Sequence, residues 1–381
     1  MPVTIYLPLF LLSYLCVKLY IRRAYKRGLL DYPDNERKFQ QEAIPVGCGG
    51  VVAMIYAGAA APGVAFATGS IVQAFVTALA ILFCVSVGSY DDRFTIPGKL
   101  KLLLTLIPAT VVVWTRFSLF QEPLELVYSC PLFGPFFLNL GAIVGTLFLI
   151  LWLTTFVNTF NLLDGADGFA TTYALLFVAT LAAIGVFWPE PDPLLQSATL
   201  YLAPLLLGFL VFNFPPAKAY LGDAGSLSIG LILGILSLNV FTNDIFARPT
   251  PLLALAALPL LDASFAIVRR VCQGKSLFEP DLEHLHHALQ KRFGGGKRLL
   301  VALVLLQLPL SLAALFAYIT SYDLIALVAF ALYCVGLPAL DVFGRKEVVL
   351  AYRAAQKLFG RRVNVEESGS AATEKAKEDA Q

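Results

Sequence analysis

Apolar segments long enough to cross a membrane recur along this chain of 381 residues, and they restrict its fold more than any other feature. A helix needs roughly 20 apolar residues to span a bilayer. Charged residues make up only 14% of the chain, whereas a soluble domain has about 25%. We therefore expect an all-α, polytopic integral membrane protein with about 11 transmembrane helices, near residues 4–21, 49–68, 70–89, 99–116, 139–158, 168–188, 195–213, 224–241, 250–270, 299–319 and 322–341.

The basic residues predict which way the chain crosses the membrane. Cytoplasmic loops of membrane proteins are enriched in Lys and Arg. With these crossings, 26 of the 28 Lys and Arg residues fall on one side, and only Arg116 and Arg248 fall on the other. The N-terminus is therefore expected outside the cytoplasm and the C-terminus inside it.

The chain is expected to form one membrane domain with a short tail. Residues 1–362 would make the transmembrane domain, and residues 363–381, which are polar and rich in small side chains, would be a disordered cytoplasmic tail. The six cysteines are scattered, so we predict neither a disulfide framework nor a cysteine metal site. The basic residues near the N-terminus follow the first apolar run, which is unlike a signal peptide.

Five polar clusters interrupt the apolar pattern, and all of them fall at predicted cytoplasmic ends of spans. The most unusual is NTFNLLDGADGFA at residues 158–170, which lies between two apolar runs. A carboxylate at the bilayer centre costs roughly 2.5–3.5 kcal/mol on insertion scales, so a position at the interface is favoured. The pattern predicts a site built from loops on the cytoplasmic face. The other clusters cover residues 31–50, 90–101, 213–226 and 280–292.

Aspartates are the main charged residues of three of these clusters. Asp91 and Asp92 are adjacent, and neighbours on a helix point about 100° apart, so we expect them to act separately. Asp164 and Asp167 are three residues apart and can share a helix face, with a turn as the alternative. Asp223 precedes an apolar span, where it could cap a helix instead of binding a ligand. Caps and turns would explain each motif taken singly.

Five carboxylates at one membrane face would repel one another unless cations lie between them. Lys99, Lys101 and Lys218 are available in the same clusters. Mg²⁺ is the other natural partner, because it takes oxygen ligands and often bridges to phosphates. The clusters together therefore predict a site for a divalent cation and a phosphate.

The only histidines of the chain, His284, His286 and His287, lie within four residues. A zinc site is one interpretation, but no cysteine is near and the carboxylates are hard ligands. Donors to a phosphate or a sugar fit the neighbouring clusters better. An interfacial cluster without a ligand is the remaining alternative.

A transporter or ion channel is the main alternative to an enzyme. Acidic residues inside the membrane and helices broken at glycine also occur in transporters. Transporter sites, however, lie near the midplane of the bilayer and are usually related by internal repeats. Here the acids gather at one face and no repeat is evident, which favours an enzyme.

The clusters resemble, in this order, the motifs of the polyprenyl-phosphate N-acetylhexosamine-1-phosphate transferases of glycosyltransferase family 4. DDRFTIPGK is similar to the first aspartate motif of the family, and NLLDGADG to its NxxDGxDG motif. NFPPAKAYLGDAGS is similar to the nucleotide and metal loop. HLHH after FEPD resembles the HIHH loop of the N-acetylglucosamine-type, undecaprenyl-phosphate branch. The likeness covers about residues 20 to 295.

The resemblance implies a reaction between a soluble donor and a lipid acceptor. N-acetylhexosamine 1-phosphate, with N-acetylglucosamine as the expected sugar, would pass from the UDP-sugar to undecaprenyl phosphate, with release of UMP. The reaction would start cell-envelope polysaccharide synthesis at the cytoplasmic face of the bacterial inner membrane. The expected cofactor is Mg²⁺, with Mn²⁺ as a substitute. Membrane lipid is an expected partner and nucleic acid is not, and a homodimer is left open.

The resemblance also implies catalytic roles. Asp223 would hold Mg²⁺, and Asp91 would activate or position the lipid phosphate. Asp92 would support the metal or the catalytic lysine, for which Lys99 is the candidate. Both a direct displacement and a two-step route through a phospho-aspartate agree with these residues.

Other motif positions would bind the substrates. Arg37 or Lys38 in the first loop would contact a phosphate, and Tyr220 would stack on the uracil. The histidines would contact the sugar or its phosphate. The residues expected to bind substrate are Arg37, Lys38, Asn158, Asn161, Asp164, Asp167, Asn213, Tyr220, His284, His286 and His287.

Two departures from the family pattern leave the sugar open. Gln40 stands where the first loop often has His, and Leu282 stands where an Arg often follows the preceding Asp. A phospho-N-acetylmuramoyl-pentapeptide transferase is the alternative within the family, although it typically has ten spans and an HHH loop. Asp262 is polar inside the ninth predicted span and could pair with Arg269, Lys99 or a bound ion.

Overall fold

The computed structural model describes residues 5–33, 42–68, 70–116, 124–130, 134–186, 193–243, 246–279, 281 and 283–358. Most of these residues are helical. The first helices are α1 Tyr6–Arg27, α2 Cys48–Thr68, α3 Ile71–Phe94, α4 Gly98–Arg116, α5 Gly141–Leu163, α6 Phe169–Val186 and α7 Pro193–Asn213. They are followed by α8 Gly222–Phe241, α9 Pro249–Leu255, α10 Ala257–Cys272, α11 Leu285–Phe293, α12 Lys297–Thr320, α13 Asp323–Ala339 and α14 Arg345–Leu358.

Ten of the eleven predicted spans each overlap one helix and the ninth overlaps two, so the all-α, polytopic class is confirmed. Within the described residues, six helices (α3, α4, α5, α6, α8 and α12) are long and apolar enough to cross a membrane, and the pair α9 and α10 would make a seventh. Shorter apolar helices lie within α2, α7 and α13. The total of eleven crossings and the sides of the termini stay predictions. The predicted tail, 363–381, lies outside the described residues.

The ninth predicted span, 250–270, is broken into two helices, although one continuous helix was expected. α9 and α10 meet at an angle of 77° around Ala256. Pro259 lies in the first turn of α10, where a backbone N–H would have no partner within the helix, so proline is tolerated there. In one continuous helix its ring would clash with the carbonyl of Leu255, so the chain bends before it.

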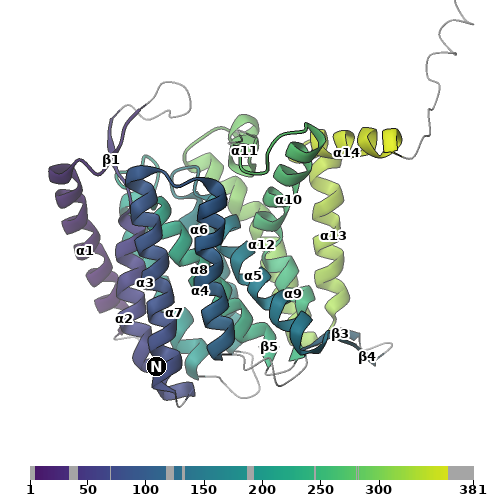
Figure 1. The fold of residues 1–381 in the computed structure, drawn as a ribbon, viewed down its shortest axis with the longest axis horizontal. Helices are drawn as coiled ribbons and strands as arrows, with labels where there is room; N and C mark the ends of the chain where they lie inside the picture. The colour runs from purple at the N-terminus through teal and green to yellow at the C-terminus, as the bar shows by residue number, and fades with distance from the viewer. Residues whose placement is uncertain are drawn as a thin grey trace, which may run out of the picture.

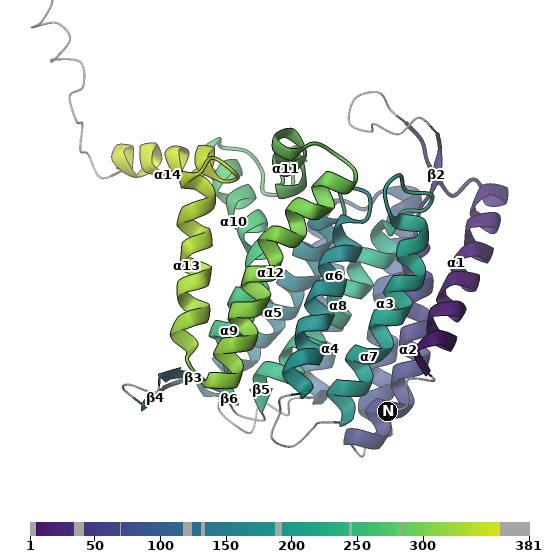
Figure 2. The same cartoon turned by 180° about the vertical axis from the view of Figure 1, so that it is seen from behind.

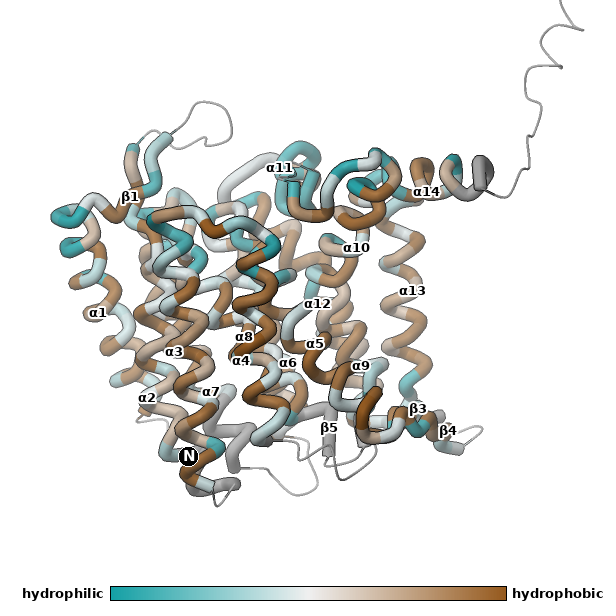
Figure 3. Tube along the Cα trace, viewed as in Figure 1, coloured by the Kyte–Doolittle hydropathy of each residue, from teal (hydrophilic) through white to brown (hydrophobic). Residues whose placement is uncertain are grey.

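The long helices run side by side, and the two ends of the bundle differ (Figures 1 and 2). One end carries α11, α14 and the antiparallel pair β1 (Leu30–Asp31) and β2 (Ile44–Pro45). Figure 3 shows that hydrophilic residues gather there, and we call it the polar end. At the opposite end, strands that were not predicted form a sheet of order β4-β3-β6-β5: β3 Glu125–Cys130, β4 Gly134–Asn139, β5 Thr242–Asn243 and β6 Phe246–Ala247.

α8 is the central helix. In its most apolar stretch 83% of the residues are buried, against 28% for α4 at the periphery. Glycines allow this burial: a Cβ at Gly88 of α3 would collide with the backbone of α8 at Asp223, and one at Gly225 would meet Gly49 of α2 at 2.6 Å. The N-terminus of α8 is thus enclosed by neighbouring helices at the polar end.

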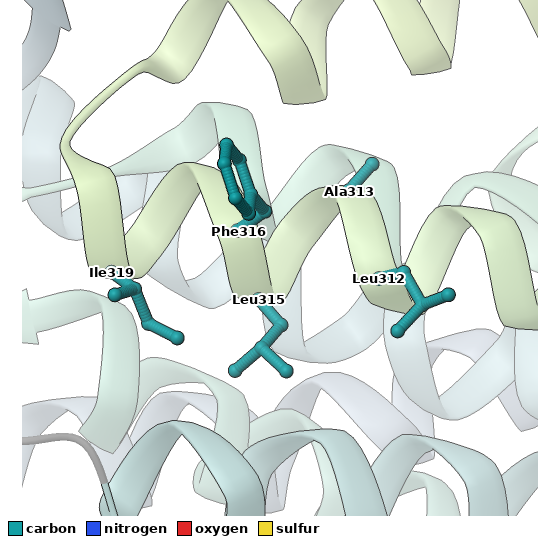
Figure 4. Close-up of a pocket in the computed structure, with 5 residues that line it drawn as sticks. All are labelled: Leu312, Ala313, Leu315, Phe316 and Ile319. Atoms are coloured by element: carbon teal, nitrogen blue, oxygen red, sulfur yellow. The ribbon is translucent and has the colours of Figure 1, made fainter.

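An apolar recess of about 420 Å³ lies along the last turns of α12, toward the opposite end of the bundle. Figure 4 shows that its lining side chains all come from this one helix. They are Leu312, Ala313, Leu315, Phe316 and Ile319. None of them can bind a phosphate or a sugar, so the candidate site is sought at the polar end.

Candidate active site at the polar end

The adjacent aspartates at the end of α3 have different partners, as predicted. The Asp92 carboxylate accepts hydrogen bonds from the backbone N–H groups of Asp223 at 2.8 Å and Ala224 at 3.1 Å. These groups are the first donors of α8, so Asp92 caps that helix and complements the positive end of its dipole. Asp91 instead accepts from the Ile96 N–H and forms an ion pair with Lys101.

Lys101 joins two carboxylates that are distant in sequence. Its Nζ pairs with Asp91 and also with Asp223 Oδ2 at 3.0 Å. Lys99, the predicted catalytic lysine, is exposed, and its Nζ lies 5.9 Å from the centre of the Phe278 ring. Residues two apart on a helix point about 200° apart, so only one of these lysines can face Asp223. In the structure, Lys101 is the lysine that faces Asp223.

A helical pattern in the sequence could have identified Lys101. The buried residues of α4 include Thr105, Ala109 and Val113, which recur every four residues. Counting back one more step leads to Lys101, whereas Lys99 falls on the exposed side. The motif DDRFTIPGK ends at Lys99 and does not include Lys101, so the motif alone does not indicate the lysine that pairs with the aspartates.

Two asparagines of α5 differ in what they hold. Asn161 donates through Nδ2 to Asp223 Oδ1 and to Ser226 Oγ, the latter at 2.7 Å. Lys101 binds the other oxygen, Oδ2, so the two side chains together fix the Asp223 carboxylate. Asn158, one turn earlier, donates to Thr105 Oγ1 at 3.0 Å and joins α5 to α4. Asn161 therefore belongs to the carboxylate cluster, while Asn158 bonds only to other protein groups, Thr105 on α4 and the Thr154 carbonyl of its own helix, among the contacts described.

Asp164 and Asp167 do not share a helix face, and the alternative, a turn, is what the structure shows. α5 ends at Leu163 and α6 begins at Phe169, so both aspartates lie in the turn between these helices. Gly168 in this turn has φ +69°, a left-handed conformation that favours glycine. Burial raises the pKa of Asp164 well above its ordinary value, and the charges of Asp223 and Asp92 raise it further.

Hydrogen bonds attach the segment 214–221 to this turn and to its neighbours. Asp167 accepts a hydrogen bond from the Ala217 N–H at 2.9 Å. The Asn213 side chain is buried, donates to the Ala219 carbonyl at 2.9 Å and accepts from Thr171 at 2.8 Å. Its amide therefore shapes the loop through contacts within the protein.

Tyr220 lies near the same aspartates. Its backbone N–H donates to the Pro45 carbonyl at 2.8 Å, which ties the segment to β2. Burial raises the pKa of Tyr220, and the charges of Asp167, Asp31 and Asp164 add to this effect. The aromatic ring predicted to stack on uracil is thus close to the turn predicted to bind the pyrophosphate.

The histidine segment packs on the turn between α5 and α6. A Cβ at Gly165 would overlap the imidazole of His286, so only glycine fits there. The His286 ring also lies 4.1 Å from that of His287 and 6.3 Å from that of Phe169. Burial lowers the pKa of His286 to about 3, with help from its two histidine neighbours. His286 is therefore neutral at physiological pH.

Asp262 has a partner that was not predicted. Its Oδ1 lies 3.1 Å from His284 Nδ1 and accepts the Leu285 N–H at 2.9 Å. Neither Arg269 nor Lys99 pairs with it; Arg269 binds Asp281 instead. The bend between α9 and α10 explains the difference, because it gives α10 its own direction and brings Asp262 to the N-terminus of α11.

Some predicted positions lie outside the described residues. They are Arg37, Lys38 and Gln40 in the segment between β1 and β2, and Leu282 before the histidines. The structure therefore brings together Asp91, Asp92, Asp164 and Asp223 with Lys101 and Asn161 at one point of the polar end. The histidine segment adjoins this cluster through Gly165.

Among the described residues, no group of three or more His, Cys, Asp or Glu side chains is arranged to hold a metal ion on its own. The cluster nevertheless suits Mg²⁺, which binds through one or two carboxylates and completes its shell with substrate phosphates and water. Hard oxygen donors are present on Asp91 and Asp223.

Comparisons with known proteins agree with these motifs. The model of the family described as glycosyl transferase family 4 matches residues 74–241, which include Asp91, the turn at Asp164 and Asp223. A probable undecaprenyl-phosphate N-acetylglucosaminyl 1-phosphate transferase of Bacillus subtilis (strain 168) is 32% identical over 301 residues, covering 78% of this chain and 79% of that protein.

Two further relatives come from other bacteria. An undecaprenyl-phosphate alpha-N-acetylglucosaminyl 1-phosphate transferase of Escherichia coli (strain K12) is 30% identical over 315 residues, 79% of this chain and 78% of that protein. A decaprenyl-phosphate N-acetylglucosaminephosphotransferase of Mycobacterium leprae is 31% identical over 284 residues, 68% of this chain and 67% of that protein. Identity of this extent shows that the chain is a multi-pass membrane protein of glycosyl transferase family 4.

Proposed function

We propose that this protein transfers N-acetylglucosamine 1-phosphate from the UDP-sugar to undecaprenyl phosphate and releases UMP at the cytoplasmic membrane surface. The observation that carries the proposal is the bridge from Asp91 through Lys101 to Asp223 at the polar end. A soluble nucleotide and the phosphate of a lipid can both reach this place, because the membrane helices end there. The names of the relatives support the same pair of substrates.

The reaction joins two anionic phosphates, so charge neutralisation is the main task of the site. An oxygen of the lipid phosphate attacks the sugar-bearing phosphorus, and the bond from this phosphorus to the oxygen of UMP breaks. Lys101 offers positive charge beside Asp223, and the N-terminus of α8 adds the positive end of a helix dipole. Positioning and electrostatic stabilisation supply most of the catalysis in phosphoryl transfer.

Asp91 fits a positioning role better than that of a nucleophile. One of its oxygens accepts the Ile96 N–H, and the other is paired with Lys101. Both contacts stabilise the carboxylate and reduce its tendency to attack phosphorus. The geometry thus favours a direct displacement by the lipid phosphate, with Asp91 holding Lys101 in place.

Magnesium, with manganese as a substitute, is part of the proposal. Asp223 would hold the ion, and Asn161 would keep the Asp223 carboxylate oriented. When bound, Mg²⁺ neutralises pyrophosphate oxygens and stabilises the leaving UMP. Both oxygens of Asp223 have partners in the structure, Asn161 on Oδ1 and Lys101 on Oδ2, so a bound metal ion would share or replace one of these contacts.

The three histidines are proposed to divide the work of recognising the donor. His284 is buried against Asp262, and His286 is buried against the turn at Gly165. His287 is the most exposed of the three, so it is the candidate for direct contact with the sugar or its phosphate. The other two hold the N-terminus of α11 beside the cluster.

An assay of UMP release tests the proposal. Purified protein would be given undecaprenyl phosphate, Mg²⁺ and a panel of UDP-sugars. We expect UMP from UDP-N-acetylglucosamine only when both the lipid and the metal are present. Preference for UDP-N-acetylmuramoyl-pentapeptide would favour the alternative within the family. Absence of UMP with every donor would refute the proposed activity.

A further inference from the structure

A corner of the chain between α13 and α14, residues 341–347, packs against α10. The Phe343 ring lies 5.3 Å from that of Phe265 in an edge-to-face arrangement. Gly344 has φ +86°, and a Cβ there would collide with the same Phe265 ring. The corner is therefore seated closely on α10, and it positions the first turn of α14.

The first turn of α14 supplies one partner of a buried charge network. The side chains of Glu347 and Arg269 are 5% and 3% exposed and form an ion pair. Arg269 also donates through Nε and Nη2 to Asp281, with Nε at 3.0 Å. Buried charges are tolerated when they are paired, so each carboxylate helps to fix the guanidinium for the other.

Asp281 in turn shapes the chain just before the histidines. Its Oδ1 accepts the Glu283 N–H at 3.0 Å. Burial raises the pKa of Asp281, but the hydrogen bonds from Arg269 and from the Glu283 N–H, together with the charge of Arg269, outweigh burial and hold the pKa below its ordinary value. The carboxylate is therefore ionised at neutral pH and remains a partner for Arg269.

One face of α10 holds both ends of the segment 281–285. Asp262 and Arg269 are seven residues, or about two turns, apart, so they lie on the same face. Asp262 binds His284 and the Leu285 N–H, while Arg269 binds Asp281. Exposed contacts add to this attachment: Lys346 pairs with Glu283 at 2.7 Å, and Arg292 donates to the Asp341 carbonyl at 3.0 Å.

We propose that Glu347 is a positioning residue for donor binding, acting through Arg269 and Asp281 on the segment that carries His284, His286 and His287. The inference rests on the proposed function, in which this segment contacts the UDP-sugar. Glu347 itself touches no reacting group. The C-terminal helix α14 is thereby part of the donor site, although it lies outside the transferase motifs.

Kinetics of Glu347→Gln test the proposal. The variant keeps the shape of the side chain and removes its charge, so Arg269 loses one of its anchors. We expect KM for UDP-N-acetylglucosamine to rise roughly tenfold, on the scale of a small misplacement of a binding group, while KM for undecaprenyl phosphate stays within about twofold. Glu347→Asp, which restores the charge, should recover part of the loss. Arg345→Ala is the matched control, because its pair with Asp341 is exposed.

A double variant tests the route of the effect. If Glu347 acts through Arg269 and Asp281, the combination of Glu347→Gln with Asp281→Asn should raise KM for the donor little beyond the larger single effect. Independent action would multiply the two effects and would overturn the proposal. Equal increases in KM for donor and lipid would also overturn it, since they indicate a general structural change.

Hydrogen exchange separates this inference from the proposed function. Backbone amides of 283–293 should exchange faster in Glu347→Gln than in the wild type, and Arg345→Ala should match the wild type. This measurement needs no turnover, so it applies even if the wild type releases no UMP and the proposed function fails. Unchanged exchange together with unchanged KM values in Glu347→Gln would show that the network does not position the segment.

Discussion

Replacing Lys101 by Met tests the central charge of the candidate site. Met keeps much of the length and apolar body of the lysine and removes its ammonium group. Asp91 and Asp223 would then face each other without the cation that joins them. We expect the variant to be recovered from the membrane and to lose most of its activity.

The magnitude follows from the geometry. At 3.0 Å from Asp223 Oδ2, a unit charge on Nζ interacts by about 5 kcal/mol at an effective dielectric constant of roughly 20. Desolvation of Lys101 offsets part of this, because its side chain is only 17% exposed. Loss of one preorganised charge of this kind lowers kcat by roughly 10²–10³-fold.

Lys99→Met is the matched control. Lys99 is exposed and its described contact is the ring of Phe278 at 5.9 Å, an interaction worth about 0.5–1 kcal/mol. Its loss should change kcat less than about tenfold. The assay is the initial rate of UMP release at saturating donor and lipid. If Lys99→Met is as damaging as Lys101→Met, the assignment of Lys101 from the structure is wrong.

Three further predictions use other contacts. Gly165→Ala should lower activity at least tenfold, because its methyl group would displace His286, whereas Gly58→Ala, which meets no neighbour within 4 Å, should be neutral in the same assay. Asp92→Ala should lower the free energy of unfolding by an amount typical of a lost helix cap, about 0.5–2 kcal/mol, which lowers the thermal midpoint in detergent. The exposed Asp341→Asn should leave the midpoint unchanged, and equal midpoints in the two variants would argue against the cap. His286 has a folded pKa of about 3, below the roughly 6.5 of an unfolded histidine, so the unfolded state binds more protons between these values. The contribution of His286 to the free energy of unfolding should therefore be fully present above about pH 6.5 and be lost as the pH is lowered toward 3. Thermal midpoints measured across this pH range should fall less in His286→Asn than in the wild type.

The membrane fold could be predicted because its signal is local. Most apolar runs contain the information for one helix, and every predicted range overlaps a helix of the structure. The break at Ala256 was missed because residues 250–270 are apolar on both sides of it. Only the position of Pro259 marks the bend, and proline also occurs inside unbroken helices of this chain, such as Pro108 in α4.

The contacts of the site were less predictable, since they depend on which helices become neighbours. The sequence separates Asp92 from Asp223 by 131 residues and Arg269 from Glu347 by 78. Periodicity can tell which side of one helix is buried, and it would have placed Lys101 rather than Lys99 on the buried side of α4. It cannot tell which buried residue of another helix lies opposite, so the partner of Asp262 had to come from the structure.

The packing of α8 and the chemistry of its N-terminus depend on the same small residues. Gly88 lets α3 approach the backbone of Asp223 so closely that Asp92, four residues later, can reach the first amides of α8. Gly222 has φ +69° and would meet Asp92 at 2.9 Å if it carried a Cβ. A larger residue at either glycine would separate α3 from α8, uncap the helix and move Asp91 and Lys101 away from Asp223 in one step. The glycines therefore set the distance between the carboxylates, and with it the charge density that a cation and two phosphates would meet.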